Sequence, residues 1–350
     1  MCKKLILITI ILLILISGCG PTNNTSNEQD FHKGISGLTI EFLKNTPPPR
    51  IFEGDNFPVI ITVKNNGAYS LKEEEKAILS LGVEKDYTKS VNLLQGGRVQ
   101  LVQTSTAQGI TLEQAAAFSL NGRSQTNSNG DEEIISYNIG AAQVDPQSEY
   151  HQSSVIVTLC YPYETVLAKT ICIDTDVNNL RPSKKVCNAQ DLILNDGQGA
   201  PVAITKIEVS MLPAQVSDQK SLSEKIRPQF LIYVENKGPG LVIKTEAVKD
   251  FCTKSDTVHE NFNIVYVDAE LSGRKLKCQL EKKEDNDELG HIKLKDKKDI
   301  IRCSTSADDS AYLADIDRNI DSYLSPLKIT LKYGYTQTIS ANYLIEKLVS

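Results

Sequence analysis

The residues of this sequence whose side chains could do chemistry are few and widely spaced. Each of the four histidines, His32, His151, His259 and His291, lacks a second ligand at the spacing of a zinc site. The sequence also lacks the Gly-x-Ser-x-Gly, Walker and Gly-x-Gly-x-x-Gly motifs, which are typical of hydrolases, nucleotide-binding proteins and dehydrogenases. We therefore predict a protein that is not an enzyme.

One acidic segment has the ligand spacing that opens an EF-hand calcium loop. Asp174, Asp176 and Asn178 stand at its first, third and fifth positions. The loop also needs a bidentate glutamate at its last position, where this sequence has Lys185. The three residues are therefore a candidate calcium site of looser geometry. Apart from this calcium, we expect the protein to have no cofactor. Residues 315–321 repeat the spacing, but we expect them on a solvated helix face, where ligands would not converge.

The first residues have the pattern of an export signal. Two lysines precede an apolar run at residues 5–16, which at ~1.5 Å of helix per residue is too short for a hydrocarbon core of ~30 Å. Ile-Ser-Gly then leads into Cys19, which resembles the lipobox of lipoprotein signal peptides. The resemblance implies that residues 1–18 are removed and that the Cys19 thiol carries a lipid. An uncleaved signal anchor is the alternative.

A polar tether follows the predicted lipid-attachment site. Residues 19–35 lack apolar periodicity, so they predict a flexible segment that holds the folded part away from a membrane. Asn23 and Asn24 both fit the Asn-x-Ser/Thr pattern and are candidate glycosylation sites. We therefore expect an exported protein, anchored by its lipid to the outer face of the cytoplasmic membrane at the cell surface.

The other cysteines agree with export. Besides Cys2 and Cys19 the chain has an even number of widely spaced cysteines and no Cys-x-x-Cys, which favours disulfides over metal in an exported protein. Six cysteines allow 15 pairings. The pairs we expect are Cys160 with Cys172 across a predicted hairpin, Cys278 with Cys303 on neighbouring strands, and Cys187 with Cys252 across the domain junction.

Two segments of similar sequence lie half a chain apart. Residues 155–173, VIVTLCYPYETVLAKTICI, and residues 327–345, LKITLKYGYTQTISANYLI, share the pattern Thr-Leu-x-Tyr-x-Tyr. Residues 58–69 and 229–240 match at nearly the same offset. We infer that one domain occurs twice. Each Tyr-x-Tyr segment is predicted to fold into a hairpin, and the first would bend near Val166.

The repeated segments have the pattern of β-strands. Val59, Ile61 and Val63 share one face of such a strand, and an Asn-Asn-Gly turn follows them. The chain is thus predicted to be all-β, with two tandem immunoglobulin-like antiparallel β-sandwich domains. Minor surface helices are expected at residues 115–118 and at about residues 309–324.

Two strand ends carry a family resemblance. ITVKNNGAY and IYVENKGPG resemble the Asn-Gly strand ends of CARDB-type and related immunoglobulin-like domains from bacterial and archaeal surface proteins. Residues 37–69, together with LCYPYET and GQGAPVAITKIEV, are similar to uncharacterised archaeal envelope proteins. The resemblance spans most of residues 36–350. It implies a sandwich fold and a cell-surface setting, and it brings no catalytic residues with it.

The composition is that of a weakly acidic globular protein. Of 350 residues, 40% are hydrophobic, and the net charge of −6 comes without a basic stripe, which argues against nucleic acid as a partner. The chain has no tryptophan, which argues against an aromatic platform for sugars. The charged run KEEEK at residues 72–76 is expected to be a solvated turn.

These features divide the chain into five parts. They are a lipoprotein signal peptide at residues 1–18, a tether at 19–35, a first domain at 36–176, a linker at 177–202 and a second domain at 203–350. The first domain also carries a long polar insertion at about residues 83–129. Recognition is expected on loops, and first of all at residues 95–108 and 121–129 of this insertion.

The function that follows is binding. We expect a lipid-anchored surface protein for adhesion, for contact with the cell wall or S-layer, or for assembly of an envelope complex. Its partner would be another envelope protein or a polysaccharide. The alternatives are an accessory subunit of an exported enzyme or secretion machine, and a lipoprotein that binds a solute or polysaccharide.

Overall fold

The computed structural model of the chain describes residues 31–94, 98–103, 110–111, 114–176, 178, 180–181, 184–214, 225–254, 259–280, 290–306 and 310–348. They belong to one compact unit, Phe31–Ser350. Cys19, Asn23 and Asn24, the predicted sites of lipid attachment and glycosylation, lie outside the described residues. None of the helices within the described ranges is long and apolar enough to span a membrane.

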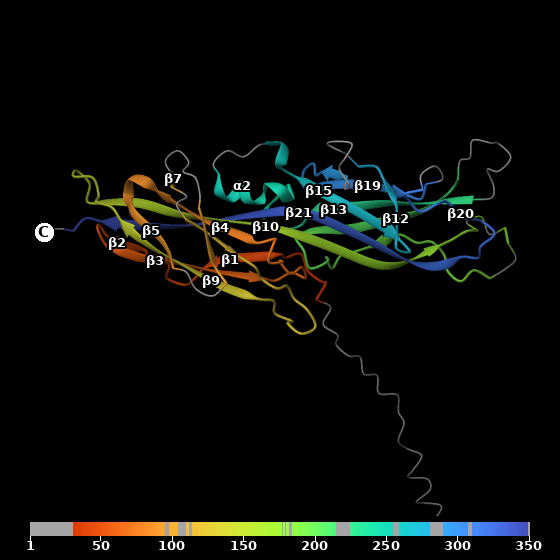
Figure 1. Cartoon of the computed structure of the whole chain (residues 1–350), viewed down its shortest axis with the longest axis horizontal. Coiled ribbons are helices and arrows are strands. Elements are labelled where there is room, and N and C mark those ends of the chain that lie inside the picture. Colours follow the sequence, from red (N-terminus) through yellow and green to blue (C-terminus); the bar gives the residue numbers. More distant parts are fainter. Residues whose placement is uncertain are drawn as a thin grey trace, which may run out of the picture. The chain divides into compact units, whose positions relative to one another are not determined.

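The fold is all-β, as the sequence predicts, and consists of three sheets (Figure 1). The first sheet contains, in spatial order, β1 (Leu38–Phe42), β3 (Asn56–Asn65), β9 (Glu132–Ala141) and β5 (Thr88–Leu94). The second follows the order β16 (Arg274–Lys275), β15 (Ile264–Leu271), β21 (Tyr323–Glu346), β10 (Tyr150–Ile173), β4 (Ala77–Glu84), β8 (Gln114–Phe118) and β6 (Gln100–Gln103). The third contains β11 (Leu192–Ile193), β12 (Val202–Pro213), β13 (Lys225–Asn236), β19 (Lys298–Ser304) and β17 (Lys277–Cys278).

Shorter elements complete these sheets. The strands are β2 (Arg50–Phe52) and β14 (Leu241–Ile243) on β21, β7 (Ile110–Thr111) on β4, β18 (His291–Lys293) on β15, and β20 (Ile316–Asp317) on β13. The helical segments are η1 (Lys85–Tyr87), η2 (Thr245–Ala247), α2 (Val248–Thr253) and η3 (His259–Asn261). Of these added strands, β2 pairs in parallel, whereas the others pair antiparallel.

The second sheet is shared by two sandwiches. One half of it packs on the first sheet, where the Tyr137 hydroxyl of β9 lies 3.5 Å from the carbonyl oxygen of Leu79. The other half packs on the third sheet, where the Thr165 hydroxyl of β10 donates to the carbonyl oxygen of Val202 at 2.6 Å. One cluster of buried apolar side chains runs through both sandwiches. The expected pair of β-sandwiches is therefore present, joined through one continuous sheet.

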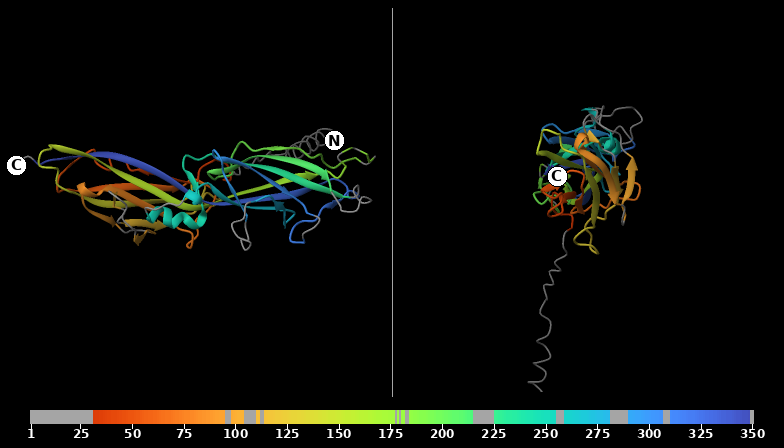
Figure 2. Two further views of the ribbon diagram at one scale, coloured as in Figure 1. Left: turned by 90° about the horizontal axis from the view of Figure 1, so that it is seen from above. Right: turned by 90° about the vertical axis from the view of Figure 1, so that its left-hand side faces the viewer.

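The repeated Tyr-x-Tyr segments form long strands, so the predicted hairpins are wrong. β10 and β21 pair along their whole length, from Tyr150 opposite Glu346 to Ile173 opposite Tyr323 (Figure 2). For the first segment the reason is local, because residues 164–170, ETVLAKT, contain no Gly, Pro, Asn or Asp that would form a turn. Each repeat therefore pairs with the other repeat instead of folding back on itself.

The pairing of β10 with β21 has the register of a local two-fold axis. Tyr161 lies opposite Tyr335, and Tyr163 lies opposite Tyr333. The first half of β10 and the second half of β21 belong to the first sandwich, and the other halves belong to the second. Residues 336–346, which the sequence division assigns to the second domain, thus complete the first sandwich.

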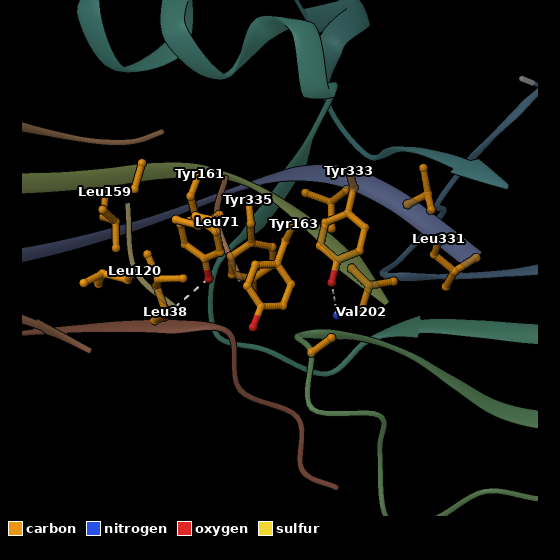
Figure 3. Close-up of a cluster of buried hydrophobic side chains, with 14 of the residues drawn as sticks. Leu38, Leu71, Leu120, Leu159, Tyr161, Tyr163, Val202, Leu331, Tyr333 and Tyr335 are labelled. Carbon is orange, nitrogen blue, oxygen red and sulfur yellow. Dashed lines mark hydrogen bonds between the residues drawn. The ribbon is translucent and has the colours of Figure 1, made fainter. Parts of the chain in front are cut away.

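Four tyrosines, Tyr161, Tyr163, Tyr333 and Tyr335, point from β10 and β21 into the core (Figure 3), and two of them bond the Asn-Gly turns of the repeats. The Tyr163 hydroxyl donates to Asn65 Oδ1 at 3.1 Å, and the Tyr335 hydroxyl donates to Asn236 Oδ1 at 3.2 Å. Both asparagines are buried, and each also bonds the backbone of the turn that follows it. The sequence repeat is therefore a repeat of one hydrogen-bonded core motif.

Both predicted surface helices are wrong. Residues 115–118 lie in β8, where packing between two strands overrides the helix preference of alanine, and the described part of residues 309–324 contains no helix. The buried Asp315 explains the second error, because it accepts hydrogen bonds of 3.1 and 2.8 Å from the Arg227 guanidinium group instead of facing solvent. Residues 83–129 are likewise not one long loop, because they contain β5, β6, β7 and β8.

All of the cysteines that were expected in disulfides are paired. The bonds join Cys160 to Cys252, Cys172 to Cys187, and Cys278 to Cys303. The last pair matches the prediction, whereas the pairings of Cys160 with Cys172 and of Cys187 with Cys252 are wrong. Without a hairpin, Cys160 and Cys172 lie on one extended strand, at ~3.3 Å per residue, and cannot meet.

Candidate ligand-binding cleft

The candidate calcium residues do not fit a calcium site. The buried Asp174 carboxylate lies 2.8 Å from the Lys185 ammonium group, and its second oxygen accepts the backbone N–H of Asp176. The Asp176 carboxylate accepts two backbone N–H groups of the following turn, which hold its pKa below the usual value. Asn178 is exposed. Because a lysine takes the place of the last ligand, a cation would have to displace an ammonium group.

The histidines are not brought together either. Each lies beside a different aromatic ring: His32 by Phe31, His151 by Tyr87, His259 by Phe262, and His291 by Tyr266. Across the part of the chain that the structure describes, no three His, Cys, Asp or Glu side chains are grouped to hold a metal ion.

A polar cleft of about 400 Å³ lies where parts of the two predicted recognition segments meet. Arg98 and Gln100 come from residues 95–108, and Asn121 comes from residues 121–129. The turn before β4 supplies the remaining charged side chains, which are Lys72, Glu73 and Lys76. We call this site the insertion cleft.

Hydrogen bonds to the chain after β8 hold the turn that forms one wall of the insertion cleft. The Ser119 hydroxyl donates to the carbonyl oxygen of Lys72 at 3.1 Å, and the backbone N–H of Gly122 donates to the Ser70 hydroxyl at 2.9 Å. On the opposite side, the Lys76 ammonium group donates to the Gln100 side-chain oxygen at 2.7 Å. The cleft is therefore shaped by contacts that are already made within the protein.

Asp131 positions two of the polar side chains of the insertion cleft. Its carboxylate accepts a 2.6 Å hydrogen bond from the Arg98 guanidinium group, and two further bonds from the backbone and side-chain N–H groups of Asn121. The Asn127 side chain donates to its second oxygen at 2.9 Å. Although desolvation of Asp131 works the other way, the bonds from Arg98 and Asn121 hold its pKa below the usual value.

The pKa of Asp131 leads to a pH-dependent prediction. The Asp131→Asn variant should lower the free energy of unfolding by about 1 kcal/mol near neutral pH, since it removes a partly exposed ion pair and weakens the hydrogen bonds around it. Because the folded-state pKa is lowered, this stabilisation is complete above the unfolded-state pKa and is lost as the pH falls through the folded-state value. Urea unfolding of the wild type and the variant at several pH values measures this difference in free energy of unfolding. A difference that is unchanged at about pH 2 would contradict the lowered pKa of Asp131.

The insertion cleft presents more positive than negative charge. Lys72 is exposed, and its ammonium group contacts no acceptor among the described residues. Arg98 is also exposed, although Asp131 partly neutralises it. Glu73 is the one carboxylate in the lining. Together with the hydroxyl and amide groups, these cations suit a ligand that carries hydroxyls and a negative charge.

The sequence did not reveal this grouping. The KEEEK run at residues 72–76 has the appearance of a solvated turn, and it contains more acids than bases. The fold brings both lysines of this run, but only one of its glutamates, Glu73, into the lining of the insertion cleft. Glu75 instead accepts a hydrogen bond of 2.5 Å from the Tyr69 hydroxyl.

Comparisons with known proteins leave the family open. No protein-family description matches the chain, and no curated protein matches it. Among solved structures, the AvmM enzyme, which catalyses macrocyclization in alchivemycin A biosynthesis, is 11% identical, with a TM-score of 0.19; 36% of this chain and 74% of that chain are covered.

Two further solved structures cover most of the chain. The C-terminal domain of the AgI/II polypeptide BspA from Streptococcus agalactiae is 10% identical and has a TM-score of 0.16, with 89% of this chain and 98% of that chain covered. The CupB6 tip adhesin from Pseudomonas aeruginosa is 8% identical and has a TM-score of 0.12, with 91% and 98% covered. At such TM-scores the likenesses place the chain in no family and carry no functional conclusion.

Proposed function

We propose that this chain is a non-enzymatic, lipid-anchored binding protein of the cell surface whose insertion cleft takes an acidic group of an envelope polysaccharide. The observation that carries the proposal is the insertion cleft itself, where three cations and several hydroxyl and amide groups surround about 400 Å³. Carboxylate or phosphate groups on a hydroxyl-rich chain match this lining in both charge and hydrogen-bonding capacity.

The rest of the molecule supports this setting. Three disulfides stabilise the sandwiches, and such bonds form and persist in oxidising compartments outside the cytoplasm. The export signal and Cys19 supply the proposed membrane anchor, and the resemblance to CARDB-type surface domains supports a cell-surface setting. The continuous second sheet would hold the two sandwiches as one body, which suits a protein that presents a binding site away from a membrane.

Binding to acidic and neutral polysaccharides tests the proposal. We expect polygalacturonate to bind the immobilised protein and neutral pullulan not to bind. The Lys72→Gln/Lys76→Gln variant should weaken polygalacturonate binding about tenfold, equivalent to ~1.4 kcal/mol, because two charge-assisted contacts are lost. Raising the salt concentration should also weaken polygalacturonate binding to the wild-type protein, since salt screens exposed charges.

A matched control separates the cleft from the overall charge of the protein. Lys169→Gln/Lys328→Gln removes the same charge from exposed positions on β10 and β21 and should leave polygalacturonate binding unchanged. Equal binding of both polysaccharides, or an equal loss in the control variant, would refute the cleft as the binding site. Shortening of the polysaccharide during incubation would refute the non-enzymatic role.

A further inference from the structure

A second, smaller apolar cluster lies on the outer face of the shared sheet. Cys252 of α2 is bonded to Cys160 of β10, and Val248 of the same helix packs with Ile78 of β4 and Ala117 of β8. The helix thus covers part of an apolar sheet face that points away from the main core (Figure 1). Burial of this face accounts for the position of α2.

The cover is incomplete, and a pocket of about 340 Å³ remains beside the helix. Ile78, Val102, Ala117 and Pro162 supply apolar surface to it. The Thr245 hydroxyl at its edge is buried without a hydrogen-bond partner among the described residues. We call this space the junction pocket. Its volume lies at the lower end of the ~300–1,000 Å³ that is usual for small-molecule sites, and an unpartnered buried hydroxyl is costly unless a ligand satisfies it.

The junction pocket adjoins the insertion cleft. Lys76 lines both spaces. On β6, Gln100 lines the insertion cleft and Val102 lines the junction pocket, and because they are two residues apart they share one face of the strand. Likewise, Ser119, which directly follows β8, lines the insertion cleft, and Ala117 of β8 lines the junction pocket. One sheet face therefore changes from polar to apolar where the two spaces meet.

Three carboxylates line the rim of the junction pocket; Glu74 is exposed to solvent, and the other two are engaged. Glu75 accepts the Tyr69 hydroxyl, and Glu246 accepts the Tyr266 hydroxyl at 3.2 Å and lies 3.8 Å from the Lys244 ammonium group. The rim also carries the exposed Lys249. A negatively charged ligand would thus find its cations in the insertion cleft and apolar surface in the junction pocket.

We propose that the two spaces form one bipartite site for an anionic glycoside that carries an apolar substituent, such as an acylated or lipid-linked acidic sugar. The acidic sugar would lie in the insertion cleft, against Lys72, Lys76 and Arg98. The apolar substituent would lie in the junction pocket, with its linking oxygen near the Thr245 hydroxyl. This inference rests on the proposed function of the insertion cleft and adds to it the class of ligand.

Three matched glycosides test the inference by calorimetric titration of the full-length protein. Octyl glucuronide carries both parts, methyl glucuronide carries the acidic sugar alone, and octyl glucoside carries the tail on a neutral sugar. We expect octyl glucuronide, below its micellar concentration, to bind at least tenfold more tightly than either of the others. The advantage over methyl glucuronide measures the junction pocket, and the advantage over octyl glucoside measures the insertion cleft.

Variants then assign each advantage to its residues. Ala117→Leu fills the junction pocket and should remove the tenfold advantage of octyl over methyl glucuronide, while methyl glucuronide binding stays unchanged. Val102→Phe, at a half-buried edge-strand position, provides a second route to the same result if the first variant misfolds. Ser136→Leu, which adds bulk to the outer face of β9, is the matched control and should have no effect.

The outcomes separate this inference from the proposed function. If both glucuronides bind with equal affinity, or if Ala117→Leu and Val102→Phe keep the tail advantage, the bipartite site is refuted and the insertion cleft stands. If octyl glucoside binds as tightly as octyl glucuronide, or if neither glucuronide binds, the charge-based role of the insertion cleft is refuted together with the bipartite site.

Discussion

Replacing Gly67 by alanine is expected to lower the free energy of unfolding by about 3 kcal/mol or more. Gly67 lies in the first Asn-Gly turn, directly over the hydroxyl of Tyr163. A Cβ atom there would overlap that hydroxyl and would lie 2.5 Å from the carbonyl oxygen of Gly199 and 2.6 Å from that of Ser36. Two of these neighbours are backbone, so a side-chain rotation cannot relieve the overlap. Chemical denaturation followed by far-UV circular dichroism measures the effect.

The equivalent glycine of the second repeat gives a sharper comparison. A Cβ atom on Gly238 would overlap the Tyr335 hydroxyl, but its next neighbour is the Pro201 side chain at 2.8 Å. Tyr335→Phe should therefore restore part of the stability that Gly238→Ala loses. Tyr163→Phe should fail to rescue Gly67→Ala, because the backbone oxygens remain in place.

An open glycine serves as the control for both variants. Gly54 has a φ of +82° and no atom within 4 Å of an added Cβ, so Gly54→Ala should cost about 1 kcal/mol of backbone strain and no overlap. A loss for Gly67→Ala no larger than that for Gly54→Ala would show that the turn can move away from Tyr163. That result would contradict the close packing of this Asn-Gly turn on the Tyr163 hydroxyl.

The second large effect concerns the disulfide that links the two halves of the chain. Cys160→Ala/Cys252→Ala should lower the free energy of unfolding by about 4.5 kcal/mol, since the bond spans 92 residues and restricts the unfolded chain strongly. Cys172→Ala/Cys187→Ala opens a span of 15 residues and should cost about 3 kcal/mol. Denaturation of both double variants under identical conditions gives the ranking.

Loss of the Cys160 to Cys252 bond should also be visible locally. The bond attaches α2 to the shared sheet, so its removal should expose the helix and speed tryptic cleavage at Lys249 and Lys254. The variant that lacks the Cys172 to Cys187 bond is the control and should be cleaved there at the wild-type rate. A reversed order of stabilities, or unchanged cleavage of α2, would contradict the role assigned to this disulfide.

Much of the fold could be predicted from local pattern. Val59, Ile61 and Val63 alternate as a strand requires, and they are buried on one face of β3. The duplicated Asn-Gly turns indicated a repeated domain, and the structure finds the same hydrogen bonds to Asn65 and Asn236. Periodicity of two and turn chemistry are properties of neighbouring residues, so the sequence carries them directly.

The partners of these strands could not be predicted in the same way. The alternation in residues 155–173 is equally compatible with a hairpin and with one long strand, and the wrong choice also produced the wrong partner for Cys160. The helix expected around Asp315 failed for a related reason. The spacing of its acidic residues is typical of a solvated helix face. In the folded protein, however, Asp315 is bonded by Arg227, which lies some ninety positions earlier in the chain.

The candidate site shows the same division. The sequence indicated which segments carry polar side chains suited to recognition, and Arg98, Gln100 and Asn121 of those segments do line the insertion cleft. It did not indicate that Lys72 and Lys76 would join them, or that Val102 and Ala117 would continue the same face into an apolar pocket.

The sequence by itself determined the all-β class, the doubling of the domain, the strand faces and the presence of disulfides. Each of these follows from side-chain type and near-neighbour spacing. The tertiary structure alone decided that β10 pairs with β21, which cysteines meet, and which charges surround the cleft. Those outcomes depend on contacts between residues far apart in the chain, whose free energies arise only when the sheets pack and exclude water.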